Sequence, residues 1–379
     1  MVALLTRITS SAAAALVLSW AVAPQQPSIA NGRVTSQPAG SPFPQSFRTL
    51  MSSQSETRWI GYTVPVVDRE RLMCCNGSSR MTGGVEVSSN GVMIGDGLSW
   101  GGCRLEPSTT APASRAEATS PAAPPGAVQL EGSDRVMVLF RIVERKLERI
   151  RLVSADCALD AGGRPVQWLE GVRAGDSVAL LESLAIDVDA SSRVLDGAVM
   201  AIALHGDPSA DSALERLAGD GHPEAVRRKV TFWLGNARGR RGFDALLKIL
   251  REDPSVEVRK SAVFGLSQSS VPEMIDRLAA IARTDNEPRL RSEALFWLAQ
   301  KAGRKAGEAI TERIEQDPDT EVKKKAVFAL SQLPKDEGVP LLINVARTNP
   351  NPVVRKQAMF WLGQSKDPRA IDFFTQVLK

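Results

Sequence analysis

The sequence predicts a multidomain α+β protein, with an all-α solenoid in its C-terminal half and a small β-rich module before it. Two observations lead to this prediction. One eleven-residue phrase recurs at a fixed interval through the C-terminal half. The segment before it alternates polar and apolar residues over short stretches and holds all four cysteines. A fixed long period is typical of solenoids, and alternation at every second residue is typical of half-buried strands.

The C-terminal half is built from copies of one phrase, which in the last copy reads VRKQAMFWLGQ. Each copy starts 32 residues after the one before, and a Phe at the seventh place and a Leu at the ninth keep this interval. The five clear copies start at Val226, Val258, Leu290, Val322 and Val354. A fainter copy starts at Val194, with Met200 in the Phe place. Such copies must stack, because one alone cannot bury its apolar side.

Each copy has the pattern of a helix pair, and about six pairs over residues 187–379 form the predicted solenoid. The phrase forms the first helix, here called the VR helix, and a second helix follows a short turn. We expect an Asp or Asn five residues before the copy to cap the VR helix. These residues are Asp189, Asp253, Asp285, Asp317 and Asn349. We expect the Arg after the first Val to pair with such an Asp of a nearby copy, which is a structural role. These residues are Arg227, Arg259, Arg291 and Arg355.

The C-terminal half resembles the HEAT-repeat superfamily, and specifically its short bacterial version, the phycobilisome-lyase-like HEAT repeats. The resemblance rests on the VRxxAxxxLG core, the preceding Asp and a second helix of the type DPRAIDFFTQVL. It implies an α-solenoid that serves as a protein-binding scaffold. One branch of these repeats helps to attach bilin pigments to antenna proteins, and nothing in residues 1–173 supports that branch.

The outward face of the VR helices is the predicted partner-binding surface. On a helical wheel with 100° per residue, Val258, Ala262 and Leu266 share one face and Phe264 lies on the opposite one. Stacking would then form three parallel rows of cations, Phe rings and amides, and soluble proteins seldom leave such a stripe unused. The predicted surface comprises Phe232, Phe264, Phe296, Phe328, Phe360, Arg228, Lys260, Lys324, Lys356, Gln268, Gln300, Gln332 and Gln364.

The alternative interpretation is that each Phe packs sideways between neighbouring VR helices and is covered. Trp233, Trp297 and Trp361 recur every 64 residues, and Gly265 and Ala329 take the same place in the intervening copies. Large residues that alternate with small ones favour interdigitated core packing, so the Trp row is predicted to be structural.

The N-terminus has the pattern of an export signal. Residues 11–23 form an apolar run of 13, which is too short to span a hydrocarbon core of about 30 Å. We assign residues 1–30 to the signal peptide, with cleavage after Ala23 or, preferably, after Ala30. An uncleaved anchor or a disordered tail is the alternative. Residues 31–56, rich in Ser, Pro, Gln and Gly, are predicted to be a flexible spacer.

Residues 57–173 are predicted to form the β-rich module, interrupted by a disordered Pro/Ala/Ser loop at 107–125. Its four cysteines are Cys74, Cys75, Cys103 and Cys157. In an exported chain this even number favours two disulfides, and adjacent cysteines rarely pair with each other. Cys74 and Cys75 would each pair with one of the other two. A four-thiolate zinc site is the weaker alternative, because its cysteine pairs are usually two to four residues apart.

The composition limits the possible functions. A net charge of +4 is too small to indicate a nucleic-acid-binding face by itself. The chain has only two histidines, His205 and His222, and neither has a Cys or Ser at a recognisable catalytic spacing. We therefore expect no catalytic residues, no metal and no cofactor.

The sequence predicts an exported, periplasmic or extracellular scaffold that binds a protein or peptide on the VR-helix face. We expect it to bind no nucleic acid and to have no stable membrane insertion after signal cleavage. The alternatives are a phycobilisome-lyase-like protein with lyase or chaperone-like activity, or a solenoid that binds nucleic acid.

Overall fold

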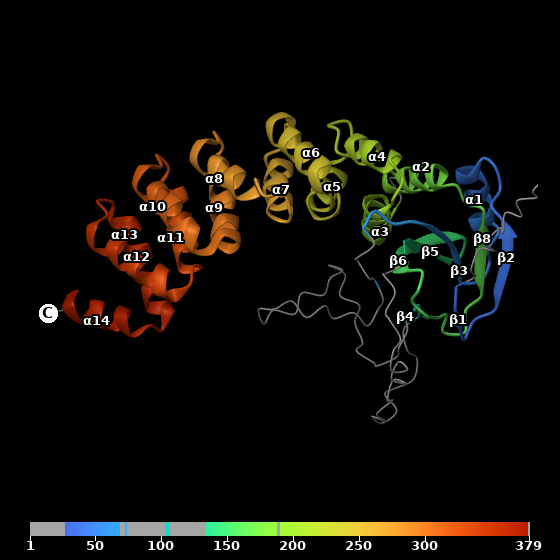
Figure 1. Ribbon diagram of the computed structural model, residues 1–379, viewed down its shortest axis with the longest axis horizontal. Coiled ribbons are helices and arrows are strands. Elements are labelled where there is room, and N and C mark those ends of the chain that lie inside the picture. The colour runs from blue at the N-terminus through green and yellow to red at the C-terminus, as the bar shows by residue number, and fades with distance from the viewer. Residues whose placement is uncertain (1–26, 69–72, 74–102, 107–133, 188–189, 378–379) are drawn as a thin grey trace, which may run out of the picture.

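The computed structural model describes residues 27–68, 73, 103–106, 134–187 and 190–377 (Figure 1). These residues form an arch, with a β-sheet at its N-terminal end and a long series of helices towards the C-terminus. The predictions for the body of the signal peptide, for Cys74 and Cys75, and for the loop at 107–125 lie outside the described residues.

The central sheet has five strands in the order β2-β8-β3-β5-β6. β3 pairs antiparallel with β5, β5 pairs antiparallel with β6, and β8 lies parallel to both β2 and β3. The strands are β2 (Val34–Pro38), β3 (Arg58–Pro65), β5 (Arg135–Val143), β6 (Lys146–Ser154) and β8 (Val166–Glu170). The alternating residues of this part of the chain therefore form strands, as the sequence predicts.

The two faces of the sheet have separate apolar contacts. On one face Tyr62 and Phe140 pack against Phe43 and Phe47 of α1 (Phe43–Ser52), and the Tyr62 hydroxyl lies 3.0 Å from the hydroxyl of Ser177. The other face buries a second apolar cluster beside a small parallel sheet in the order β1-β7-β4. Its strands are β1 (Ile29–Ala30), β4 (Cys103–Arg104) and β7 (Leu159–Asp160).

The prediction of a flexible spacer at 31–56 is wrong. β2 pairs along its whole length with β8, and α1 buries Phe43 and Phe47 in the core. These two rings stand four residues apart, so they lie on one face of a helix. The polar composition of the segment hides this short apolar pattern. Ile29–Ala30 also forms a strand, so cleavage after Ala30 would remove β1.

Two of the four cysteines lie among the described residues, and both are buried. Cys103 lies in β4 and Cys157 lies just before β7, and each is disulfide-bonded. Because Cys74 and Cys75 are not described, the pairing stays a prediction. The four-thiolate zinc site is not formed, since two of its four sulfurs are oxidised.

The helices form the six pairs that the sequence predicts, including the faint first copy. The VR helices are α3 (Ser192–Leu204), α5 (Glu224–Ala237), α7 (Val256–Ser267), α9 (Pro288–Ala302), α11 (Thr320–Ser331) and α13 (Pro352–Ser365). Their partners are α4 (Ser209–Leu217), α6 (Gly239–Glu252), α8 (Met274–Thr284), α10 (Gly307–Gln316), α12 (Lys335–Thr348) and α14 (Pro368–Val377). A short 3-10 helix, η1 (Gly303–Ala306), precedes α10. No helix in the described part of the chain is long and apolar enough to cross a membrane.

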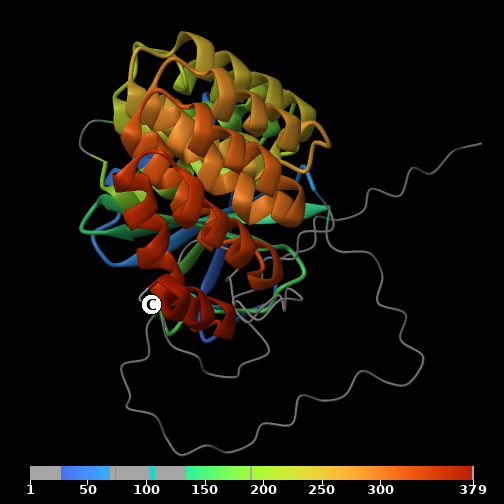
Figure 2. The same ribbon diagram turned by 90° about the vertical axis from the view of Figure 1, so that its left-hand side faces the viewer.

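The VR helices form the inner layer of the arch. Figure 1 shows α5 and α9 on the inner side and α4, α6, α8 and α10 on the outer side. Successive VR helices pack directly on one another, whereas the outer helices touch each other far less. In the view of Figure 2, helices of successive pairs lie nearly parallel. The inner layer is therefore the more tightly packed one.

Inside the stack, each VR helix buries the face that the helical wheel predicts. Val258, Ala262 and Leu266 are all fully buried. A Cβ atom on Gly265 would lie 2.3 Å from the carbonyl oxygen of Thr231 on α5, so only glycine allows this approach of α7 to α5.

The predicted N-caps are displaced by two residues. Asp253 and Asp317 end the preceding helices, and Ser255 and Asp319 cap α7 and α11. The Asp253 and Asp317 carboxylates instead accept hydrogen bonds from the backbone N–H two residues further on, at 2.8 and 3.0 Å. Such Asx turns satisfy the backbone between two helices, so the acidic residue stabilises the turn rather than the helix start.

The predicted Arg–Asp pairs exist between some successive copies. Arg291 donates two hydrogen bonds to Asp317, at 2.7 and 2.8 Å, and both side chains are buried. Arg227 lies 3.3 Å from Asp253 in the same way. Arg355 instead donates to the backbone of its own turn. Burial raises the pKa of Asp317, but the hydrogen bonds from Arg291 outweigh it and hold this pKa below its usual range.

The β-rich module is docked on the solenoid. The N–H of Val67 donates to the carbonyl of Leu204 at 2.9 Å, and the N–H of Gly206 donates to that of Pro65 at 2.8 Å. His205, between these contacts, is fully buried. One apolar core includes residues from α1, the sheet, α2 (Ala174–Ala185) and every helix pair. The module and the solenoid are therefore parts of one folded body.

We expect Arg291→Met to destabilise the protein by about 3–5 kcal/mol, because it leaves the Asp317 carboxylate buried without its partner. Arg289→Met, which removes an exposed pair with Glu257 at 2.9 Å, is the matched control and should cost less than about 1 kcal/mol. Urea unfolding of the two variants measures the difference. Equal losses would contradict a special role for the buried pair.

Acidification should weaken the docking of the module through His205. Burial lowers the pKa of His205 to about 4, below the ordinary value of 6.5. The unfolded chain therefore takes up this proton as the pH falls below 6.5, while the folded chain does not until about pH 4. The stability that neutral His205 contributes is complete above pH 6.5 and is lost between pH 6.5 and 4, up to roughly 3 kcal/mol.

The thermal midpoint measured from pH 7.5 to 4 tests this titration. In His205→Gln the loss of stability over this window should be smaller than in the wild type. His222→Gln, which changes the other histidine, should keep the wild-type slope. An unchanged slope in His205→Gln would assign the titration to another group.

Candidate partner-binding surface

The aromatic side chains of the VR helices form one continuous chain of contacts from α5 to α13. Phe232 stacks on Phe264 with ring centroids 5.7 Å apart, and Phe264 lies 4.8 Å from Trp297. Phe296 stacks on Phe328 at 6.0 Å, with ring planes only 3° apart. Each Trp also contacts the Phe before it in sequence, at 4.9 to 5.1 Å. This aromatic ladder comprises Trp233, Phe232, Phe264, Trp297, Phe296, Phe328, Trp361 and Phe360.

The rings of the ladder are packed sideways and also partly open. The first four Phe rings are half-buried, and Phe360 is 53% exposed. The three Trp rings pack against the core, as predicted, but none is fully buried. Both interpretations of the Phe row therefore contain part of the arrangement. Sequence reasoning separated the Trp row from the Phe row, although the 64-residue spacing of the Trp residues signals that they belong to the same surface.

The predicted cations lie beside the ladder, and several face carboxylates of the same surface. Lys260 lies 3.6 Å from Glu293, and Lys324 lies 2.9 Å from Glu321. Arg228 is exposed and donates to the hydroxyl of Ser261 at 3.3 Å. Lys356, the last cation of the row, is exposed. The row is a mixed stripe of charges rather than a continuous basic band.

The predicted amides divide into two kinds. Gln268 and Gln332 end α7 and α11 and donate to the adjacent Ser267 and Ser331 hydroxyls, at 2.8 and 3.0 Å. Gln300 and Gln364 are exposed near the ends of their helices. The first pair has a local structural role, and the second pair is open to a partner.

A cavity of about 440 Å³ opens on the ladder between α11 and α13. Its walls combine two rings of the ladder with charged and amide side chains. It is lined by Glu321, Lys324, Lys325, Phe328, Gln357 and Trp361. Sequence reasoning missed Lys325 and Gln357, because only the first cation of each copy was assigned to the surface.

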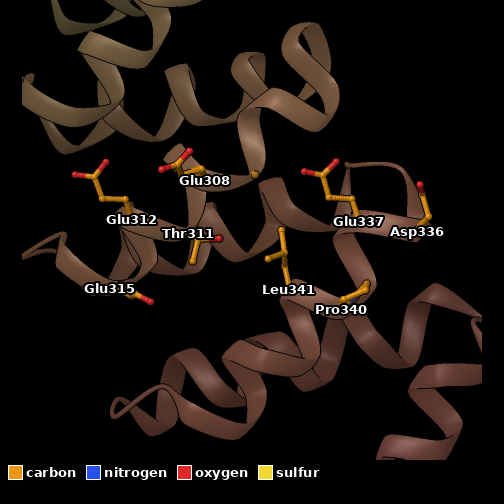
Figure 3. A pocket seen from close by; sticks show the side chains of 9 residues that line it. Glu308, Thr311, Glu312, Glu315, Asp336, Glu337, Pro340 and Leu341 are labelled. Atoms are coloured by element: carbon orange, nitrogen blue, oxygen red, sulfur yellow. The ribbon is translucent and has the colours of Figure 1, made fainter.

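A second cavity, of about 590 Å³, lies between the outer helices α10 and α12 (Figure 3). Five acidic residues line it, with Leu341 and Thr311 between them. The acidic residues are Glu308, Glu312, Glu315, Asp336 and Glu337. The two helix layers therefore offer different surfaces, one aromatic with mixed charges and one acidic.

The chemistry of the described residues is that of binding. His205 is buried, and its Nδ1 accepts a hydrogen bond from the N–H of Asp207 at 3.1 Å. Across the described ranges no group of three or more His, Cys, Asp or Glu side chains could hold a metal ion. The ladder can bury apolar groups of a partner, while its flanking charges supply hydrogen bonds.

The ladder should contribute to stability in proportion to the burial of each ring. Phe264→Ala removes ring contacts with Phe232 and Trp297 and should cost about 1–3 kcal/mol. Phe360→Ala removes a mostly exposed ring and should cost less than about 1 kcal/mol. Thermal unfolding followed by circular dichroism compares the two. A larger loss for Phe360→Ala would contradict this assignment of burial.

Comparison with known proteins supports the repeat assignment. A family model described as HEAT repeats matches residues 221–299 and 307–379, and the break between the two segments contains η1. No curated protein sequence matches the chain with significance.

Among solved structures, Escherichia coli YibA is 25% identical over 45% of this chain and 64% of its own, with a TM-score of 0.33. The CpcE and CpcF complex of phycocyanin lyase from Nostoc sp. PCC7120 is 23% identical over 41% of this chain and 99% of the matched chain, with a TM-score of 0.32. Kap121p is 12% identical over 54% of this chain and 27% of its own, with a TM-score of 0.36. From the repeats and the family match we conclude that the C-terminal half of the chain belongs to the HEAT-repeat family.

Proposed function

We propose that this protein is an exported, non-catalytic scaffold that binds an extended segment of a protein partner along the inner layer of its arch. The observation that carries the proposal is the aromatic ladder. Eight rings cross five repeats in unbroken contact, and most of them are half-buried rather than covered. A rigid, partly open aromatic stripe buries apolar groups of a partner at little entropic cost.

The flanking charges favour a peptide over a nucleic acid. Lys260, Lys324 and Arg228 each have an acidic residue within 4.0 Å, so the local field of these cations is partly neutralised. A phosphate-tracking surface requires cations without such neighbours, in a dense stripe. The mixed charges beside the rings suit the side chains of a polypeptide.

Export and the disulfides fit together in this proposal. Disulfides persist in oxidising compartments outside the cytoplasm. Because Ile29–Ala30 forms strand β1, we now place the cleavage after Ala23, which keeps that strand in the mature chain. The disulfide-containing module then covers the first repeats of the solenoid, as terminal caps do in repeat proteins.

The test is a binding experiment with matched variants of the mature chain. The triple variant Phe264→Leu/Phe296→Leu/Phe328→Leu removes three rings but keeps apolar volume, so the helices should stay folded. The control Glu308→Gln/Glu312→Gln changes the acidic outer cavity instead. A partner captured from the envelope fraction of the source organism is identified and purified, and its Kd is measured with each variant.

We expect the triple variant to bind the purified partner at least tenfold more weakly, with circular dichroism unchanged, and the control to bind like the wild type. Affinity should fall only slightly with added salt, because apolar burial dominates. Unchanged affinity in a folded triple variant would refute binding on the ladder. A steep fall with salt would point to the nucleic-acid alternative.

A further inference from the structure

The ladder contains the same two-helix arrangement twice, 64 residues apart. In the first unit, Phe264 of α7 lies against Trp297 of α9, with centroids 4.8 Å apart and ring planes at 33°. In the second unit, Phe328 of α11 lies against Trp361 of α13, at 4.9 Å and 42°. Because the rings repeat so closely, the side chains around them can be compared position by position.

The first unit holds a carboxylate of its own. Glu293 of α9 accepts a hydrogen bond from the indole N–H of Trp297 at 2.7 Å. The same carboxylate lies 3.6 Å from the ammonium of Lys260 on α7. A ring pair, an indole donor and a lysine therefore surround one carboxylate, and every group of this set has a partner.

The second unit has the same receptor without the carboxylate. Gln357 stands at the position of Glu293, and Lys324 stands at that of Lys260. The indole N–H of Trp361 is buried and has no hydrogen-bond acceptor among the described residues. The cavity of about 440 Å³ opens beside this indole. A buried donor without a partner is rare in proteins, and here it lines a cavity.

The charges of the two units differ in the same sense. The first unit balances two cations against two carboxylates, which are Lys260, Arg289, Glu257 and Glu293. The second unit has two cations and one carboxylate, which are Lys324, Lys325 and Glu321. The second unit therefore has an excess positive charge beside its vacant donor.

We propose that the cavity between α11 and α13 binds a glutamate side chain of the partner segment, at the position that Glu293 fills in the first unit. The carboxylate displaces Gln357, accepts the indole N–H of Trp361 and lies between Lys324 and Lys325, with its methylene groups on Phe328. Lys324 becomes available because its pair with Glu321 is exposed and contributes little. This inference rests on the proposed function and names the chemistry of the partner.

The experiment uses the full mature chain labelled with ¹⁵N at tryptophan and two blocked peptides. The first peptide is acetyl-Phe-Glu-Phe-amide, and the second has Gln in place of Glu. The indole resonance of Trp361 is assigned with Trp361→Phe. We expect the Glu peptide to move this resonance downfield in a saturable way, and the Gln peptide to bind at least tenfold more weakly. No movement with the Glu peptide, or an equal response to both, would overturn the proposal.

Two exchanged variants control for non-specific binding to the ladder. Gln357→Glu supplies the carboxylate internally, so its Trp361 resonance should be shifted without peptide and should not respond further. Glu293→Gln should create a second responding resonance at Trp297. A wild-type response in Gln357→Glu would overturn the proposal. So would a response to acetyl-Phe-Gln-Phe with a free C-terminal carboxylate but not to the Glu peptide.

The outcomes separate this inference from the proposed function. If the Gln and Glu peptides act alike while the triple Phe→Leu variant loses its partner, the ladder binds but the carboxylate site fails. If Trp361 responds to glutamate while the triple variant binds its partner normally, the carboxylate site holds and the proposed function fails.

Discussion

The close packing of each VR helix on the next is the constraint on which the rest of the structure depends. Gly265 brings the backbone of α7 against that of α5, at a distance that a Cβ atom would not allow. At this separation the Phe rings of successive copies reach one another and stack. The buried Arg291–Asp317 pair holds the turn of one copy against the VR helix of the copy before it. The inner surface is therefore continuous because the helices beneath it are in direct contact.

The period of the sequence predicted this inner layer well, because a strict repeat reports the same burial at every copy. The helical wheel correctly buried Val258, Ala262 and Leu266. It treats one helix alone, however, and so it could not show that Trp297 reaches back to Phe264 on the preceding helix. The caps were displaced for a similar reason, since an Asp can end one helix or begin the next and the spacing fits both.

The N-terminal part was harder to predict because its signals are short. Strand β5 is a long apolar run that the sequence shows clearly, whereas α1 enters the core through only two aromatic rings. The polar composition around Phe43 and Phe47 resembles that of a linker. The docking of the module was also not predictable, since it depends on backbone contacts between the end of β3 and the loop after α3. Such contacts leave no pattern in side-chain type.

The alternation of Trp with small residues has a geometric consequence for any segment that lies along the arch. Trp297 and Trp361 are two helix pairs apart, and neighbouring packed helices are about 8–10 Å apart, so the indoles are roughly 20 Å from each other along the arch. An extended chain advances about 3.3 Å per residue. A bound segment would therefore meet a Trp about once in every six residues, and its anchoring side chains would need to follow that rhythm. The spacing of the indoles acts as a ruler that selects partners by sequence register as well as by composition.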